Sequence, residues 1–205
     1  MQWHRWWREN QWAAYLEHMD LPVRASSKLA LQRLEAERGE LFAAKDLADL
    51  LLGDPLLALR LLKDANQRLP RRLARDITTP LGVILALGTD RFREQLFAAP
   101  EADESNPGFL RSEARAILAG QVAMALGGLH CDLDPGELAL AALLSNAGEI
   151  EMWAFAPELP ERARAERLSG RAPRSEQAQL TACGFTFKSL TLLLTEHWNL
   201  PQLIL

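Results

Sequence analysis

Residues 47–66 read LADLLLGDPLLALRLLKDAN, and this stretch decides the fold. Its apolar residues recur every three or four positions on both sides of Gly53, which is the spacing of one helix face. Glycine commonly ends a helix, whereas Asp-Pro begins one, because the Asp54 side chain accepts hydrogen bonds from free N–H groups and Pro55 fits the first turn. The stretch therefore predicts a helix over residues 43–52 and a second helix directly after it.

The same helical period extends through the rest of the chain, and the alternating β-branched runs of strands do not occur. The fold class that we expect is therefore all-α, a multi-helix bundle. We expect Ser26 or Ser27 and Asp90 to cap helices, and the polar segment 99–108 (APEADESNPG) to be a linker. The further helices that we expect lie at about residues 54–66, 79–88, 90–98, 109–126, 134–147, 149–156, 158–168, 174–182 and 186–198.

The linker divides the chain into an N-terminal helical lobe at residues 21–98 and a second helical lobe at residues 108–205. Residues 1–20 stand apart as a Trp-rich extension. The closing residues 199–205 (NLPQLIL) look like the start of another helix, so we expect the natural chain to continue past Leu205.

Composition excludes several classes of protein. The 205 residues are 48% hydrophobic and 24% charged, as in globular domains, and the net charge of −4 argues against a nucleic-acid-binding surface. Arg71, Arg72 and Arg75 are interpreted as a solvated helix end. Cys131 and Cys183 fit neither a zinc site nor a disulfide framework, which favours a reducing, cytoplasmic compartment. No window of 18 uninterrupted apolar residues occurs, so we expect no transmembrane segment.

Four of the six tryptophans, Trp3, Trp6, Trp7 and Trp12, lie in the first twelve residues. On one helix over residues 2–19, Trp12 would lie on one face and the other three on the opposite face. One face would dock on the domain, and the other would meet a second subunit, a protein partner or, less favourably, a membrane surface. A kinked helix that wraps all four into one intramolecular groove is an equal alternative. We expect a protein partner or self-association through this segment.

Five motifs follow one another along the chain: Leu21-Pro22 before a helix, residues 47–66, residues 85–92 (LALGTDRF), residues 141–149 (AALLSNAGE) and residues 184–201 (GFTFKSLTLLLTEHWNLP). Together and in this order they resemble the HDOD family, the HD-related output domains of bacterial signalling proteins. The resemblance covers residues 21–205. It implies an HD-domain-like helical fold and a regulatory role in the bacterial cytoplasm.

The resemblance also implies that a metal site has been lost. HD phosphohydrolases hold a divalent metal with one His, an adjacent His-Asp pair and a later Asp. Here the His-Asp pair reads Ser145-Asn146, Arg115 lies near the first His position, and Phe187 lies in the last motif. A hydroxyl, an amide, a cation and a ring are poor ligands for such metals. The relic cleft, with Arg115, Ser145, Asn146, Glu149 and Phe187, would then contact a ligand, and we expect neither a bound metal nor a cofactor.

No other catalytic arrangement is visible in the sequence, because the Walker A, G-x-S-x-G and G-x-G-x-x-G patterns are absent. Glu149 and Glu151 are interpreted as a solvated face. The four histidines, His4, His18, His130 and His197, are interpreted as surface or helix-capping residues.

The function that we expect is a non-enzymatic signalling or scaffolding domain. One rival is a diverged metal-dependent phosphohydrolase that acts on nucleotides or cyclic dinucleotides. The other rival is a ligand-binding sensor that kept the cleft and lost the chemistry.

Overall fold

The computed structural model describes residues 7–39, 42–68, 77–129 and 132–198. Within these ranges the chain is helical, and the extended backbone forms only one isolated β-bridge, so the all-α expectation is confirmed. The helices are α1 (Glu9–Glu17), α2 (Ala25–Arg38), α3 (Ala44–Leu52), α4 (Pro55–Arg68), α5 (Pro80–Leu87), α6 (Thr89–Ala98), α7 (Pro107–Gly127), α8 (Pro135–Leu144), α9 (Ala147–Phe155), α10 (Glu158–Leu168), α11 (Ser175–Cys183) and α12 (Phe187–His197).

Helix α4 forms the centre of the core because it is apolar on nearly all sides. Its leucines are buried, and it packs against α3, α5, α6, α7, α8 and α9. A helix that is apolar all round must be enclosed by others. Gly53 ends α3, and the N–H of Leu57 donates to Asp54 Oδ1 at 3.0 Å, so the predicted break and cap are both confirmed.

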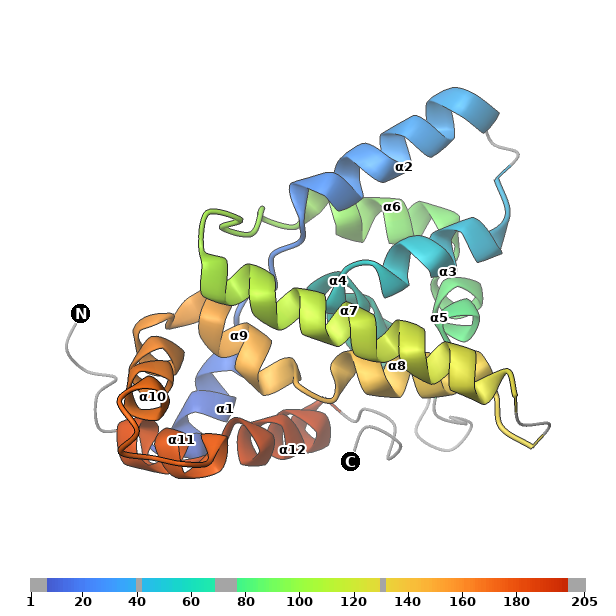
Figure 1. Cartoon of the computed structure of the whole chain (residues 1–205). Coiled ribbons are helices and arrows are strands. Elements are labelled where there is room, and N and C mark those ends of the chain that lie inside the picture. The colour runs from blue at the N-terminus through green and yellow to red at the C-terminus, as the bar shows by residue number, and fades with distance from the viewer. Residues whose placement is uncertain (1–6, 40–41, 69–76, 130–131, 199–205) are drawn as a thin grey trace.

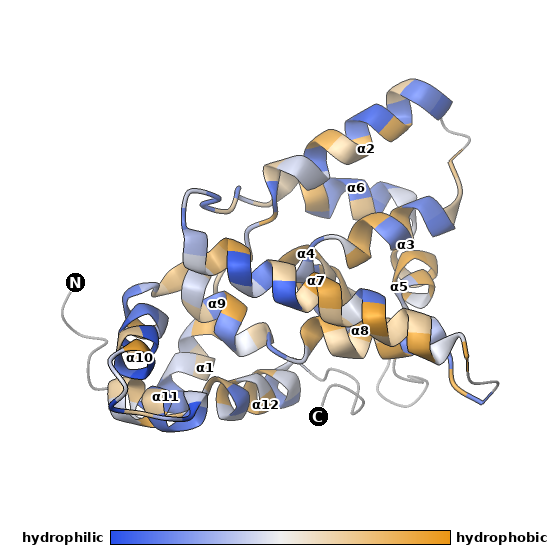
Figure 2. Ribbon diagram, viewed as in Figure 1, coloured by the Kyte–Doolittle hydropathy of each residue, from blue (hydrophilic) through white to orange (hydrophobic). Residues whose placement is uncertain are grey.

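The other helices surround α4 in two groups (Figure 1). Helices α2, α3, α5 and α6 lie at one end, while α1, α10, α11 and α12 lie at the other. The long helix α7 crosses between the groups and returns through α8, which packs closely against it. Figure 2 shows why α8 is covered and α10 is peripheral, since α8 is mostly hydrophobic and α10 mostly hydrophilic. One hydrophobic core runs through both groups.

Helix α1 belongs to this core. Trp12 is 1% exposed and Leu16 is fully buried, and Glu9 and Glu17 contact α12 through Ser189 Oγ (3.1 Å) and His197 Nδ1 (3.0 Å). The expectation that Trp12 forms an interaction surface is therefore wrong, because its side chain is enclosed by the chain itself.

Trp7 also lies differently from the helical-wheel prediction. It precedes α1, and Arg8 has extended backbone (φ −89°, ψ 170°), so Trp7 turns back to contact Trp12 at 5.2 Å and Tyr15 at 5.5 Å between ring centroids. The described part of the segment thus follows the intramolecular alternative. Trp3, Trp6 and His4 lie outside the described residues, as do the cluster of Arg71, Arg72 and Arg75, the pair His130 and Cys131, and residues 199–205.

Two of the predicted helix caps are wrong. Helix α2 begins at Ala25, before Ser26 and Ser27, because carboxylates from elsewhere accept its first N–H groups: Asp54 Oδ2 from Arg24 at 2.9 Å and Glu104 Oε1 from Ala25 at 3.0 Å. Helix α6 begins at Thr89, and Asp90 lies inside its first turn. Its N-cap is Gly88, whose φ of 76° lets the chain turn directly out of α5.

The predicted linker is extended but well packed. Val23 N donates to Pro100 O and Ala102 N to Val23 O, each at 2.9 Å, which ties the linker to the segment before α2. Asn106 then caps α7 by accepting from the N–H of Gly108. The helix after Pro135 ends at Leu144 rather than near residue 147, because the chain turns at Ser145-Asn146 before α9. In the described part of the chain, no helix has the length and hydrophobicity to cross a membrane.

Candidate functional site

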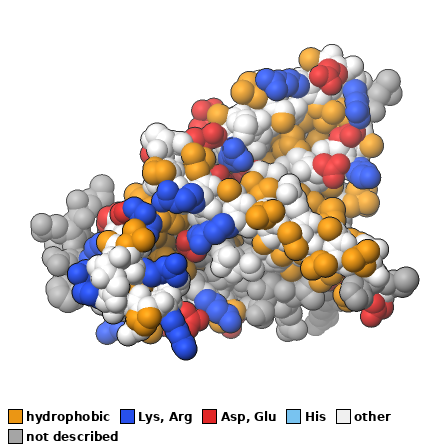
Figure 3. All heavy atoms as spheres, viewed as in Figure 1, with side chains coloured by type: hydrophobic (Ala, Val, Ile, Leu, Met, Phe, Trp, Pro, Cys, Tyr) orange, Lys and Arg blue, Asp and Glu red, His pale blue; other side chains and the backbone are white. Residues whose placement is uncertain are grey.

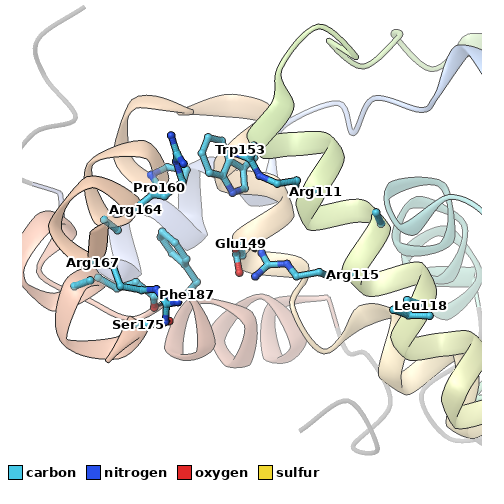
Figure 4. A pocket seen from close by; sticks show the side chains of 15 residues that line it. Arg111, Arg115, Leu118, Glu149, Trp153, Pro160, Arg164, Arg167, Ser175 and Phe187 are labelled. Carbon is cyan, nitrogen blue, oxygen red and sulfur yellow. Dashed lines mark hydrogen bonds and ion pairs between the residues drawn. The ribbon is translucent and has the colours of Figure 1, made fainter. Parts of the chain in front are cut away.

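A cavity of about 490 Å³ opens where α7, α9, α10, α11 and α12 meet. Figure 4 shows its walls: arginines from α7 on one side, arginines from α10 on the other, and aromatic side chains between them. The residues that line it are Gly108, Arg111, Ala114, Arg115, Leu118, Glu149, Trp153, Pro160, Ala163, Arg164, Arg167, Ser175, Ala178, Gln179 and Phe187.

Two arginines on each wall follow from helical spacing. Arg111 and Arg115 are four residues apart on α7, and Arg164 and Arg167 are three apart on α10, so each pair shares one helix face. All four side chains are exposed to solvent, those of Arg111 and Arg115 on α7 and those of Arg164 and Arg167 on α10. In Figure 3, Lys and Arg side chains gather around this hollow end of the molecule, while apolar side chains cover the second half of α7.

Glu149 is the single acidic residue among the described residues that line the cavity. Its Oε1 accepts from Arg115 Nη2 at 2.5 Å, which joins α9 to α7. Arg164 pairs instead with Glu161 on its own helix, with Nη2 to Oε1 at 2.8 Å, and Arg167 Nη1 donates to Ser175 Oγ at 3.3 Å. Arg111 makes no hydrogen bond or ion pair with any described residue.

The floor of the cavity is aromatic and closely packed. Trp153 from α9 packs over Gly108, where an added Cβ would lie only 2.2 Å from the indole ring. Phe187 begins α12 and makes an edge contact with Phe185 at 6.3 Å between centroids. At Gly148 an added Cβ would lie 2.8 Å from the backbone oxygen of Phe187, so α9 and α12 approach as closely as glycine permits.

The structure brings together only part of the predicted relic cleft. Arg115, Glu149 and Phe187 line the cavity, whereas Ser145 and Asn146 do not. Ser145 is exposed at the end of α8, and its hydroxyl donates to Ala142 O at 2.9 Å. Asn146 is exposed before α9, and its side chain caps nothing. The turn that carries both residues lies outside the lining.

A divalent metal does not fit the side chains at this place. Arg115 and Phe187 offer no metal donor, and Glu149 is already paired with a cation. Thr186, beside Phe187 in the last motif, uses its hydroxyl to accept from Ser189 N at 3.0 Å. Among the described residues no group of three or more His, Cys, Asp or Glu side chains could hold a metal ion.

A second polar group lies buried between α2, α4 and α7, and sequence reasoning missed it. Glu113 is 1% exposed, neither of its carboxyl oxygens accepts a hydrogen bond from a described residue, and Arg24 Nε lies 3.8 Å from Oε2. Burial, reinforced by the nearby Asp54 carboxylate, raises the pKa of Glu113 to about 8. A signal was present, because Glu113 shares a helix face with Phe109 and Ala116, which are both buried.

Glu151 corrects the expectation of a solvated face. It is fully buried on α9, while Glu149, two residues earlier, points into the cavity. Residues two apart on a helix lie on nearly opposite faces, so both could not face solvent beside one core. Desolvation raises the pKa of Glu151 well above its ordinary value, and Lys63 opposes this in part.

Comparison with known proteins agrees with this architecture. The HDOD domain model matches residues 25–205. A crystal structure of the MmoQ response regulator from Methylococcus capsulatus str. Bath is 20% identical and has a TM-score of 0.73 over 92% of this chain and 75% of that one. A virulence factor from Campylobacter jejuni subsp. jejuni is 18% identical, with a TM-score of 0.74 over 96% of this chain and 72% of the other. None of the curated proteins matches the chain.

Proposed function

The chain belongs to the HDOD domain family, and we propose that it acts as a non-catalytic regulatory domain in bacterial signal transduction, through binding of a ligand or a protein. The observation that carries this proposal is the Arg115–Glu149 ion pair, which lies where the family resemblance expects a metal ligand. A guanidinium group repels a divalent cation and uses up the carboxylate that could have bound one.

Hydrolysis of a phosphoester by the HD mechanism needs a metal-bound water of lowered pKa. The segments that would supply its ligands offer an arginine, a hydroxyl, an amide and a phenyl ring. The MmoQ response regulator, which shares the fold at 20% identity, is by its name a signalling protein, and we extend that context to this chain as part of the proposal.

Metal content and turnover test the proposal together. The purified chain is incubated with Mn²⁺, desalted, analysed for bound metal, and assayed on bis(p-nitrophenyl) phosphate with and without EDTA. We expect no stoichiometric metal and no turnover above that of Arg115→Ala. EDTA-sensitive turnover that this variant loses would establish the rival phosphohydrolase, whereas turnover that it retains would indicate a contaminant.

Association through the N-terminal segment is a further part of the proposal, and it now concerns Trp3 and Trp6. Because Trp12 belongs to the core, the informative deletion removes residues 1–6 and leaves α1 whole. We expect the shortened chain to keep its helical circular dichroism and to lose self-association in size-exclusion chromatography with light scattering. If the two forms have the same mass in solution and the shortened chain still binds the same partners, this role is refuted.

A further inference from the structure

We propose that the cavity lined by α7, α9, α10, α11 and α12 binds a small phosphorylated molecule that carries a planar ring. This inference rests on the proposed ligand-binding role and names the chemical class of the ligand. It is carried by the charge, the shape and the lining of the cavity.

The charge of the cavity is opposite to that of the chain. The protein has a net charge of −4, yet four arginines line this one hollow. Two carboxylates oppose them: Glu149, which pairs with Arg115, and Glu161, which pairs with Arg164. Four positive charges against two negative ones leave an excess of two, and a phosphate monoester carries roughly −1.5 to −2 at neutral pH. One phosphate group would therefore neutralise the cavity.

Two guanidinium groups have the donors to bind it. Arg111 makes no hydrogen bond or ion pair with a described residue, and Arg167 makes one long bond of 3.3 Å to a hydroxyl. The planar fork of an arginine matches two oxygens of a phosphate and stays charged at any physiological pH. In Figure 4 these arginines extend from opposite walls of the cavity, so an anion inside it would be attracted from two sides.

The N-terminus of α11 adds to the same field. Ser175 begins this helix and lines the cavity together with Ala178 and Gln179, which share its face. Arg174, the N-cap residue, provides no side-chain acceptor for the free N–H groups of the first turn. These groups and the positive end of the helix dipole favour a negative charge close by, and the first turn itself carries one exposed carboxylate, Glu176.

The remaining lining favours an apolar, flat group on the ligand. Trp153 and Phe187, which are 6% and 5% exposed, form the floor, and Leu118, Pro160 and the alanines complete the apolar wall. The volume of about 490 Å³ is in the range of roughly 300–1,000 Å³ that is usual for small-molecule sites. A hollow bordered by five helices suits a compact ligand better than an extended peptide.

Adenosine monophosphate and its two halves, adenosine and inorganic phosphate, test the inference by isothermal titration calorimetry. We expect the nucleotide to bind more tightly than either half and more tightly than citrate. Equal affinities for citrate and for the nucleotide would contradict a preference for phosphate. Equal affinities for adenosine and for the nucleotide would contradict a contribution of the arginines to binding. No heat with the nucleotide or with phosphate would overturn the site.

Charge variants then locate the binding. Arg111→Gln and Arg167→Gln should weaken nucleotide binding about tenfold or more, since each removes a charge-assisted contact. Arg115→Gln and Glu149→Gln break the same ion pair but should act in opposite directions, because the first lowers the positive excess and the second raises it. The control is Arg33→Gln, an exposed arginine of α2 far from the cavity. Equal effects of Arg111→Gln and Arg33→Gln would mean that binding is non-specific.

The nucleotide recovered from the calorimeter separates the two proposals. If the nucleotide binds and is recovered intact, both the ligand site and the non-catalytic function are supported. If it binds and is converted to adenosine when Mn²⁺ is present, the non-catalytic function fails and the site stands. If it neither binds nor changes, the site fails and the non-catalytic function stands.

Discussion

Glutamine in place of Glu113 should make the protein more stable in alkaline solution. Glu113 is 1% exposed, and burial raises the pKa of its carboxyl from 4.5 to about 8. The folded state therefore holds a proton that the unfolded state releases between these two values, so the free energy of unfolding falls as the pH rises through that window. A glutamine side chain keeps the shape of the protonated acid and does not titrate, so the variant escapes this loss.

The size of the effect follows from the same shift. Each tenfold change in proton affinity is worth about 1.4 kcal/mol, so from about pH 5.5 to about pH 8.5 Glu113→Gln should gain about 3 kcal/mol on the wild type. Urea unfolding followed by circular dichroism at both pH values measures this difference. Glu37→Gln, on the exposed face of α2, is the control and should gain nothing. A difference that stays constant within about 1 kcal/mol across that range would refute the reasoning.

Three further predictions concern packing, capping and reactivity. Gly148→Ala should cost about 1–3 kcal/mol in urea unfolding, because the new Cβ would meet backbone atoms of α12 at 2.8 and 2.9 Å, while Gly128→Ala, with contacts of 3.6 Å, should cost less than about 1 kcal/mol. Asp54→Ala should lose about 3 kcal/mol of unfolding free energy, since three donors lose their acceptor, and Asp54→Asn should lose less because its amide oxygen still accepts. Burial raises the pKa of Cys183 to about 11, so iodoacetamide at neutral pH should alkylate the Cys183 peptide far more slowly in native protein than in urea, as mass spectrometry would measure; equal rates would contradict this.

Local rules predicted most helix boundaries because most caps here are local. Asp54, Thr79 and Asp134 each accept from an N–H two or three residues ahead, as their positions before a proline indicate. The start of α2 escaped the same rules because its acceptors, Asp54 and Glu104, come from far along the chain. An acceptor that comes from a distant part of the chain cannot be recognised in the sequence around the helix.

The candidate site was predictable to a similar, partial degree. The family resemblance placed Arg115, Glu149 and Phe187 together, and all three line the cavity. It also placed Ser145 and Asn146 there, but the break between α8 and α9 turns them to solvent. The arginines of α10 were missed, since their three-residue spacing shows that they share a face and not which neighbour that face meets.

The two ligand classes considered for this fold require opposite charge. A divalent cation needs carboxylates in excess, and its neighbours must tolerate added positive charge. The cavity instead has two more guanidinium groups than carboxylates, with the positive end of α11 beside them. A metal ion brought here would meet repulsion from both walls, whereas an anion would meet attraction from both. Because the HD mechanism needs a metal-bound water to attack the phosphate, a cavity that binds an anion without a divalent cation favours a regulatory ligand site over a surviving phosphohydrolase.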